Sequence, residues 1–238
     1  MNVDGSMIAL TTVSRHAVRA MVLLMLGTVA FLLLRYPDLP WLLPVHFRTG
    51  GIPNGWQYKT LGRVMMPAMV QSALMLIFGS IAALLLSRAK SGYHALAPDV
   101  RAASAAAETV LLIALIWVAF QAYAAVALIR VWATERGHLG NWYPLLEVTG
   151  LLLTGIVAAR GHVLVGRPSP RPDVPEHWRF GQLYKNPDDP ALFVPTRDGC
   201  RWTLNFGRPV AAALLAIVLV LGVLGPTVLL LLALRVNF

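Results

Sequence analysis

Long uncharged runs of apolar residues dominate this sequence and restrict what it can fold into. Val210–Leu234 contains no charged residue, and about 20 helical residues are enough to cross the hydrocarbon core of a bilayer. The whole chain is 57% hydrophobic and 13% charged, whereas about 25% of the residues of a soluble domain are charged. We therefore predict an all-α, multi-pass membrane protein.

Five segments have the composition of a membrane-crossing helix. The first is short and needs Arg19 and Arg35 to extend it by snorkelling. The fourth contains Glu147 and Arg160, so it crosses only if both ions lie near its ends. Arg35-Tyr36-Pro37 stands where a signal peptide would have a small-residue cleavage site, so the first span is predicted to stay uncleaved. The predicted spans are Ala20–Leu34, Val64–Ser87, Ala102–Ile129, Trp142–Val165 and Val210–Leu234.

The polar stretches between these runs define three regions. Residues 1–165 form a four-span membrane region that includes an outer loop at 36–63. Residues 166–208 form a cytoplasmic insert with a β-hairpin, and residues 209–238 form the fifth transmembrane helix.

The basic residues predict the orientation of these spans. With the N-terminus inside, 13 of the 20 Lys and Arg residues fall on the inner side and 7 on the outer side. Because cytoplasmic loops carry the excess of Lys and Arg, this count favours a bacterial inner (cytoplasmic) membrane with the N-terminus cytoplasmic and the C-terminus periplasmic. The same rule explains the net charge of +9 without a nucleic-acid partner. The lipid bilayer is the first expected partner.

The outer loop is rich in prolines and turn residues. Prolines remove backbone donors and prevent a regular helix, so we expect an ordered loop on the bilayer surface. Its aromatic residues suit the headgroup region. The candidate outer-loop binding residues are His46, Phe47 and Trp56.

The insert contains a hairpin pattern. Ala191–Pro195 and Arg201–Phe206 read as strands around an Asp198-Gly199 turn. An isolated two-stranded hairpin is marginal in water, so its aromatic face must lie on the ends of the spans, on the membrane interface or on a protein partner. The candidate insert residues are Asn186, Asp189, Phe193, Trp202, Asn205 and Phe206.

Several polar side chains fall inside or beside the predicted spans. We expect Gln71 to hydrogen-bond Gln121 between helices, and Arg130 to pair with Glu147. Glu108 is expected to cap a helix or to pair with a loop arginine. The alternative for these groups is a polar lining for a transported solute or an ion relay.

No pattern predicts a cofactor, a metal site or a catalytic residue. His46 and His138 have acidic neighbours but lack zinc-ligand spacing. Asp188 and Asp189 fit a turn better than a calcium loop. Cys200 is the single cysteine, which excludes an internal disulfide. A lipid-modifying enzyme would have only His46 with Asp38 as a weak candidate pair, so we expect a protein that is not an enzyme.

Two stretches resemble known bacterial membrane families. The outer loop contains Tyr36-Pro37-x-Leu39-Pro40, Pro44-x-His46-Phe47, Gly51-x-Pro53 and Trp56. This pattern resembles the small N-terminal domain of SdpI-like immunity proteins, where it also follows the first span. The insert, from Tyr184 to Pro209, resembles a second uncharacterised domain attached to such proteins. The resemblance implies protection from a secreted toxin, although the further spans of the immunity proteins are not recognisable here.

The sequence therefore predicts a bacterial inner-membrane protein that acts by binding, in an immunity, sensing or accessory-subunit role. A protein partner is expected in the membrane or at the cytoplasmic face. The alternative is a small transporter or permease component with a polar site around Gln71, Gln121 and Glu147.

Overall fold

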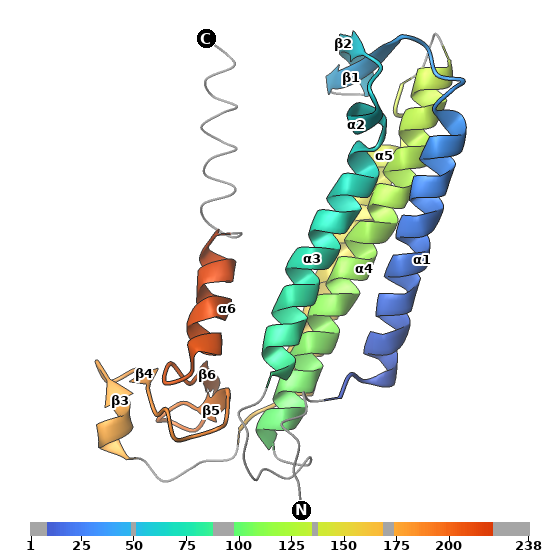
Figure 1. The fold of residues 1–238 in the computed structure, drawn as a ribbon. Coiled ribbons are helices and arrows are strands. Elements are labelled where there is room, and N and C mark those ends of the chain that lie inside the picture. The colour runs from blue at the N-terminus through green and yellow to red at the C-terminus, as the bar shows by residue number, and fades with distance from the viewer. Residues whose placement is uncertain (1–8, 49–50, 88–97, 135–137, 169–173, 221–238) are drawn as a thin grey trace, which may run out of the picture. The chain divides into compact units, whose positions relative to one another are not determined.

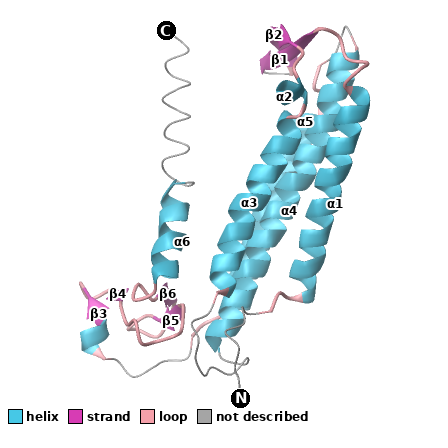
Figure 2. Cartoon of the chain, in the orientation of Figure 1, coloured by secondary structure: helices cyan, strands magenta, loops and turns pink. Residues whose placement is uncertain are grey.

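The computed structural model describes residues 9–48, 51–87, 98–134, 138–168 and 174–220. The fold is mostly helical, with short strands in two places (Figures 1 and 2). The chain divides into two compact units. The helical unit comprises Thr11–Ser80 and Glu108–Gly161, and the second unit holds the remaining described residues.

Among the residues that the structure describes, four helices are long and apolar enough to cross a membrane, as a multi-pass membrane protein requires. They are α1 Thr12–Arg35, α3 Met66–Leu86, α4 Pro98–Ala133 and α5 Trp142–Val165. Of the predicted fifth span, α6 Pro209–Leu219 is described as helix, and the residues from 221 onward lie outside the described part.

The first helix is longer than its uncharged run. The Thr11 side chain accepts a hydrogen bond from the Ser14 N–H and caps the start of α1, as threonine at an N-cap does. Arg15, His16 and Arg19 are therefore helical. This extension gives α1 the length of a span although Ala20–Leu34 alone is short.

The predicted ordered loop contains a β-hairpin, which the sequence analysis did not predict. β1 Leu42–Arg48 pairs antiparallel with β2 Ile52–Tyr58, and α2 Leu61–Val64 follows. Pro44 and Pro53 lie inside these strands. Both strands of a two-stranded sheet are edges, and an edge tolerates proline because one side needs no ladder donor.

A buried cluster joins this hairpin to the helices at one end of the helical unit, which we call the hairpin end (Figure 1). The Trp132 indole N–H of α4 donates to the Pro44 carbonyl at 2.9 Å. At the turn, Gly51 has a φ of 73° and its carbonyl accepts from the Leu139 N–H. The buried members are Leu32, Leu39, Leu43, Val64, Ala68, Ala125, Ile129, Val131 and Trp132.

Glycines set the close approach of α5 to α4. Gly161 lies so near the Thr109 side chain that a Cβ would overlap it, and Gly150 lies against Ile116 and Trp117. Small residues let membrane helices approach closely where no hydrophobic effect drives them together. The α5 backbone at these glycines therefore packs directly against side chains of α4. This packing holds α5, the predicted span with the shortest uncharged run, against its neighbour.

The insert confirms the predicted hairpin and adds a second one. β5 Phe193–Pro195 pairs with β6 Trp202–Leu204, with Val194 opposite Thr203. Ahead of it, the 3-10 helix η1 Pro175–His177 leads into β3 Trp178–Arg179 and β4 Leu183–Tyr184. The Phe206 N–H donates to the Tyr184 carbonyl at 2.8 Å and links the two hairpins.

Candidate functional site

A half-open cleft lies at the hairpin end of the helical unit. It has a volume of about 500 Å³. We call it the hairpin cleft, and its lining combines the hairpin, the turn before it and the end of α4. The lining residues are Asp38, Pro40, Leu42, Pro44, Pro53, Trp56, Val131, Trp132, Ala133 and Thr134.

The walls of the hairpin cleft are rigid and mixed in chemistry. Its three hairpin-side prolines have fixed φ angles, and the Trp132 indole is held by its bond to Pro44. Trp56 is 54% exposed, which leaves a large aromatic surface available to a partner. Asp38 contributes the acidic group of the lining. Concave sites in which aromatic and apolar walls are combined with polar groups are typical binding sites.

Two cations fix the backbone around the cleft. The Lys59 ammonium donates to the Tyr36 and Leu39 carbonyls at 3.2 and 2.8 Å. It also lies 5.0 Å from the centre of the Tyr36 ring, within cation–π range. Arg63 donates to the Gln57 side chain and the Tyr58 carbonyl. These bonds hold the turn and the base of β2 against α2.

Of the three predicted outer-loop residues, one lines the cleft. Trp56 does so, whereas the His46 ring lies against Gly55 and Phe47 packs on the buried cluster. Trp132 was not predicted as a cleft residue, because the sequence places it at the end of an apolar run, where nothing distinguishes a lining residue from a lipid-facing one.

The expected bond between Gln71 and Gln121 does not form. Gln71 is completely buried, and its amide N–H donates to Thr28 Oγ1 at 3.2 Å and to the Val118 carbonyl at 2.9 Å. The side-chain partner, Thr28, is on α1, because α1 packs beside α3. The sequence alone did not predict which helices are neighbours. In the described residues, Gln71 Oε1 has no hydrogen-bond partner.

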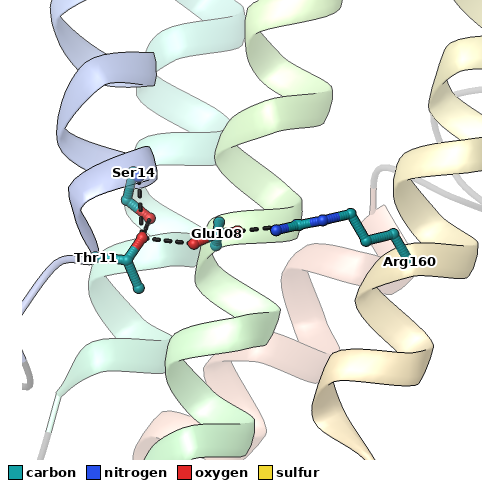
Figure 3. Close-up of polar contacts among 4 residues, drawn as sticks. All are labelled: Thr11, Ser14, Glu108 and Arg160. Atoms are coloured by element: carbon teal, nitrogen blue, oxygen red, sulfur yellow. Dashed lines mark hydrogen bonds and ion pairs between the residues drawn. The ribbon is translucent and has the colours of Figure 1, made fainter.

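The intramembrane charges pair differently from the prediction (Figure 3). Arg130 and Glu147 form no ion pair within the described chain, and Glu147 is exposed on α5. Instead the Arg160 guanidinium lies 2.9 Å from Glu108 Oε1. Thr11 Oγ1 donates to Glu108 Oε2 at 2.6 Å. Glu108 thus pairs with a span arginine, and the contact connects α1, α4 and α5 at the end opposite the hairpin.

The three residues of the alternative transporter site differ in burial and in hydrogen bonding. Gln71 is buried between α1 and α4, Gln121 makes no hydrogen bond with it, and Glu147 is exposed near the start of α5.

Asn205 organises the insert. Its side chain is completely buried and donates to the carbonyls of Asn186, Asp189 and Ala191 at 2.8, 3.0 and 3.2 Å. Its Oδ1 accepts from the N–H groups of Asn186 and Gly207. Buried backbone N–H and C=O groups need hydrogen-bond partners. Where the chain turns too sharply to form paired strands, the Asn205 amide supplies those partners for five backbone groups.

The other predicted insert residues make contacts of their own. Asp189 Oδ1 accepts from the Ala191 N–H, and its Oδ2 accepts from the Tyr184 hydroxyl. Phe193 and Phe206 are half-buried. The Trp202 indole N–H donates to the Gly166 carbonyl at 2.9 Å, so the β5–β6 hairpin is attached directly after the end of α5.

The β5–β6 turn carries an acidic side chain in a structural role. Thr196 Oγ1 donates to Asp198 Oδ1 at 2.5 Å, and the Cys200 N–H donates to the same oxygen at 3.0 Å. The Thr196 hydroxyl, followed by the Cys200 N–H, lowers the pKa of this carboxyl. Within the described residues, no three His, Cys, Asp or Glu side chains group closely enough to hold a metal ion.

Two family models match the chain. Residues 23–70 match a domain of unknown function, DUF1648, and residues 187–211 match a family of unknown function, DUF5808. The first match covers the end of α1, the whole hairpin and the start of α3. The second covers Asn205 and the β5–β6 hairpin. The curated proteins and the solved structures give no match.

Proposed function

We propose that this protein acts by binding, without catalysis, and that the hairpin cleft is where its partner docks. The observation that carries this proposal is the exposed Trp56 ring, which lines the same cleft as Asp38. The backbone of this cleft is fixed by prolines and by Lys59. Such a surface loses little conformational entropy on binding, and aromatic side chains dominate the affinity of protein interfaces.

We further propose that the cleft faces the periplasm of a bacterial inner membrane, with the insert in the cytoplasm. The distribution of Lys and Arg supports this orientation. The resemblance of the outer loop to SdpI-like proteins supports a secreted protein or peptide as the partner and immunity as the role. A sensing or accessory-subunit role uses the same cleft with a different partner.

Photo-crosslinking from the cleft tests the binding role. With benzoylphenylalanine in place of Trp56, full-length protein in cells should form a defined crosslinked species, because the probe sits where the partner docks. The matched control places the probe at Ile52, which is 55% exposed on β2 but does not line the cleft. A secreted peptide in the adduct supports immunity, and a membrane protein supports an accessory role. Equal adducts from both positions, or none from Trp56, would show that the cleft is not the docking site.

Thiol labelling of intact cells tests the orientation. Cys200 is the only cysteine and is exposed. A membrane-impermeant maleimide should leave it unmodified until the cells are permeabilised. In a Cys200→Ser background, Ile52→Cys should react without permeabilisation. Labelling of Cys200 from outside would reverse the orientation.

A further inference from the structure

The tip of the β3–β4 hairpin presents an aromatic ring with no packing role in the described structure. Phe180 is 95% exposed. Leu183, the strand partner of Arg179, is also exposed, at 42%. The hydrophobic effect should bury such side chains, so a ring held almost entirely in solvent needs a reason outside the fold of the insert.

The backbone at this tip is unfavourable for phenylalanine. The Gln182 N–H donates to the Arg179 carbonyl and closes a turn in which Phe180 and Gly181 have φ angles of 50° and 73°. Turns with both central residues at positive φ favour Asn, Asp or Gly. A bulky side chain there is strained. Asparagine would suit the turn better, so the phenylalanine ring does not serve the local fold.

The insert is attached at both of its ends to helices, because it follows α5 and leads into α6. The Trp202 bond to Gly166 attaches it after α5, and β6 leads through Arg208 into α6. The Phe206 bond to Tyr184 fixes β4 to this frame. Phe180 is four residues before Tyr184, at most about 14 Å of extended chain. The tip is therefore within reach of the headgroup layer in which α5 ends.

The charges around the tip fit an anionic surface. Arg179 and Lys185 are exposed on either side of Phe180, and Glu176 is the exposed acidic residue of the same segment. An apolar ring flanked by cations is the arrangement by which a peripheral segment enters an anionic interface.

We propose that the β3–β4 tip is a membrane anchor: Phe180 inserts into the lipid surface beside the spans, and Arg179 and Lys185 bind anionic headgroups. This contact fixes the insert on the bilayer and is independent of the partner at the hairpin cleft. It requires only that the insert lies next to a leaflet, on whichever side.

Spin-label accessibility in nanodiscs tests this anchor. Full-length Cys200→Ser protein carries a nitroxide at Gln182→Cys, next to Phe180 in the turn. We expect the label to be more accessible to oxygen than to a water-soluble nickel complex in discs containing phosphatidylglycerol, and less so in pure phosphatidylcholine. Phe180→Asn should reduce the ratio of docked to undocked insert about tenfold, the loss expected for one buried aromatic side chain.

Two controls separate docking from folding. Phe180→Leu keeps an apolar side chain and should keep the label at the bilayer. A nitroxide on the native Cys200, in the other hairpin, should give the same spectrum in the native protein and in the Phe180→Asn variant if the insert remains folded. The proposal would be overturned if the label at position 182 were equally accessible in the protein with Phe180 and in the Phe180→Asn variant. It would also be overturned if the accessibility did not respond to the anionic lipid. Protection seen only in discs that hold two chains would assign the tip to a second copy instead.

Discussion

Replacing Gly207 with alanine should unfold the insert while leaving the spanning helices intact. A Cβ at this position would overlap the Asn186 carbonyl group and the Pro187 nitrogen, and these are backbone atoms that no rotamer change can move. Displacing Asn186 also breaks its two bonds to the buried Asn205 amide. Overpacking costs about 1–3 kcal/mol and each unsatisfied buried polar group about 1–3 kcal/mol more, which exceeds what two short hairpins can supply.

Limited trypsin digestion of the full chain in detergent measures this effect. In the native protein the bonds around Lys185 and Arg201 should be protected, and Gly207→Ala should expose them at much lower protease concentration. Gly181→Ala is the matched control, because its Cβ meets nothing within 4 Å and only the φ of 73° is unfavourable. An alanine at this φ costs about 1–2 kcal/mol. Native protease resistance in Gly207→Ala would show that the contact with Asn186 does not hold the insert together.

Elements with a strong local signal were predictable from the sequence. The four spans follow from apolar length, and β5–β6 follows from the alternation on either side of Asp198-Gly199. The β1–β2 hairpin was missed because Pro44 and Pro53 argue against strands in a wide sheet, and only the pairing shows that both strands are edges. The β3–β4 hairpin has two-residue strands, too short for any periodicity.

The polar contacts were less predictable, because they depend on which helices are neighbours. The sequence analysis assumed that consecutive spans are neighbours, and on that basis it predicted contacts of Gln71 with Gln121 and of Arg130 with Glu147. The fold instead sets α1 against α3 and α4, so Thr28 reaches Gln71 and Thr11 reaches Glu108. The matched family segments, residues 23–70 and 187–211, contain the hairpin and the Asn205 amide but not Glu108 or Arg160. The ion pair between Glu108 and Arg160 therefore lies in a part of the chain that neither family model covers.

Arg160→Met should destabilise the helical unit by about 3 kcal/mol, toward the low end for breaking a buried ion pair. Glu108 is only 8% exposed, and among the described residues its carboxylate would keep just the Thr11 hydroxyl as a partner. Arg160 is 47% exposed and loses less. The midpoint of unfolding in mixed detergent micelles measures the loss.

The double variant Glu108→Gln with Arg160→Met shows whether the stranded charge causes that loss. It should recover most of the stability, because a neutral amide still accepts from Thr11 and no uncompensated charge remains in the membrane. Glu147→Gln, which removes an exposed carboxylate on α5, should change the midpoint by less than about 0.5 kcal/mol in equivalent free energy. If the double variant were no more stable than Arg160→Met alone, the side-chain packing of Arg160 against α4, and not its charge, would hold this end of the helices together.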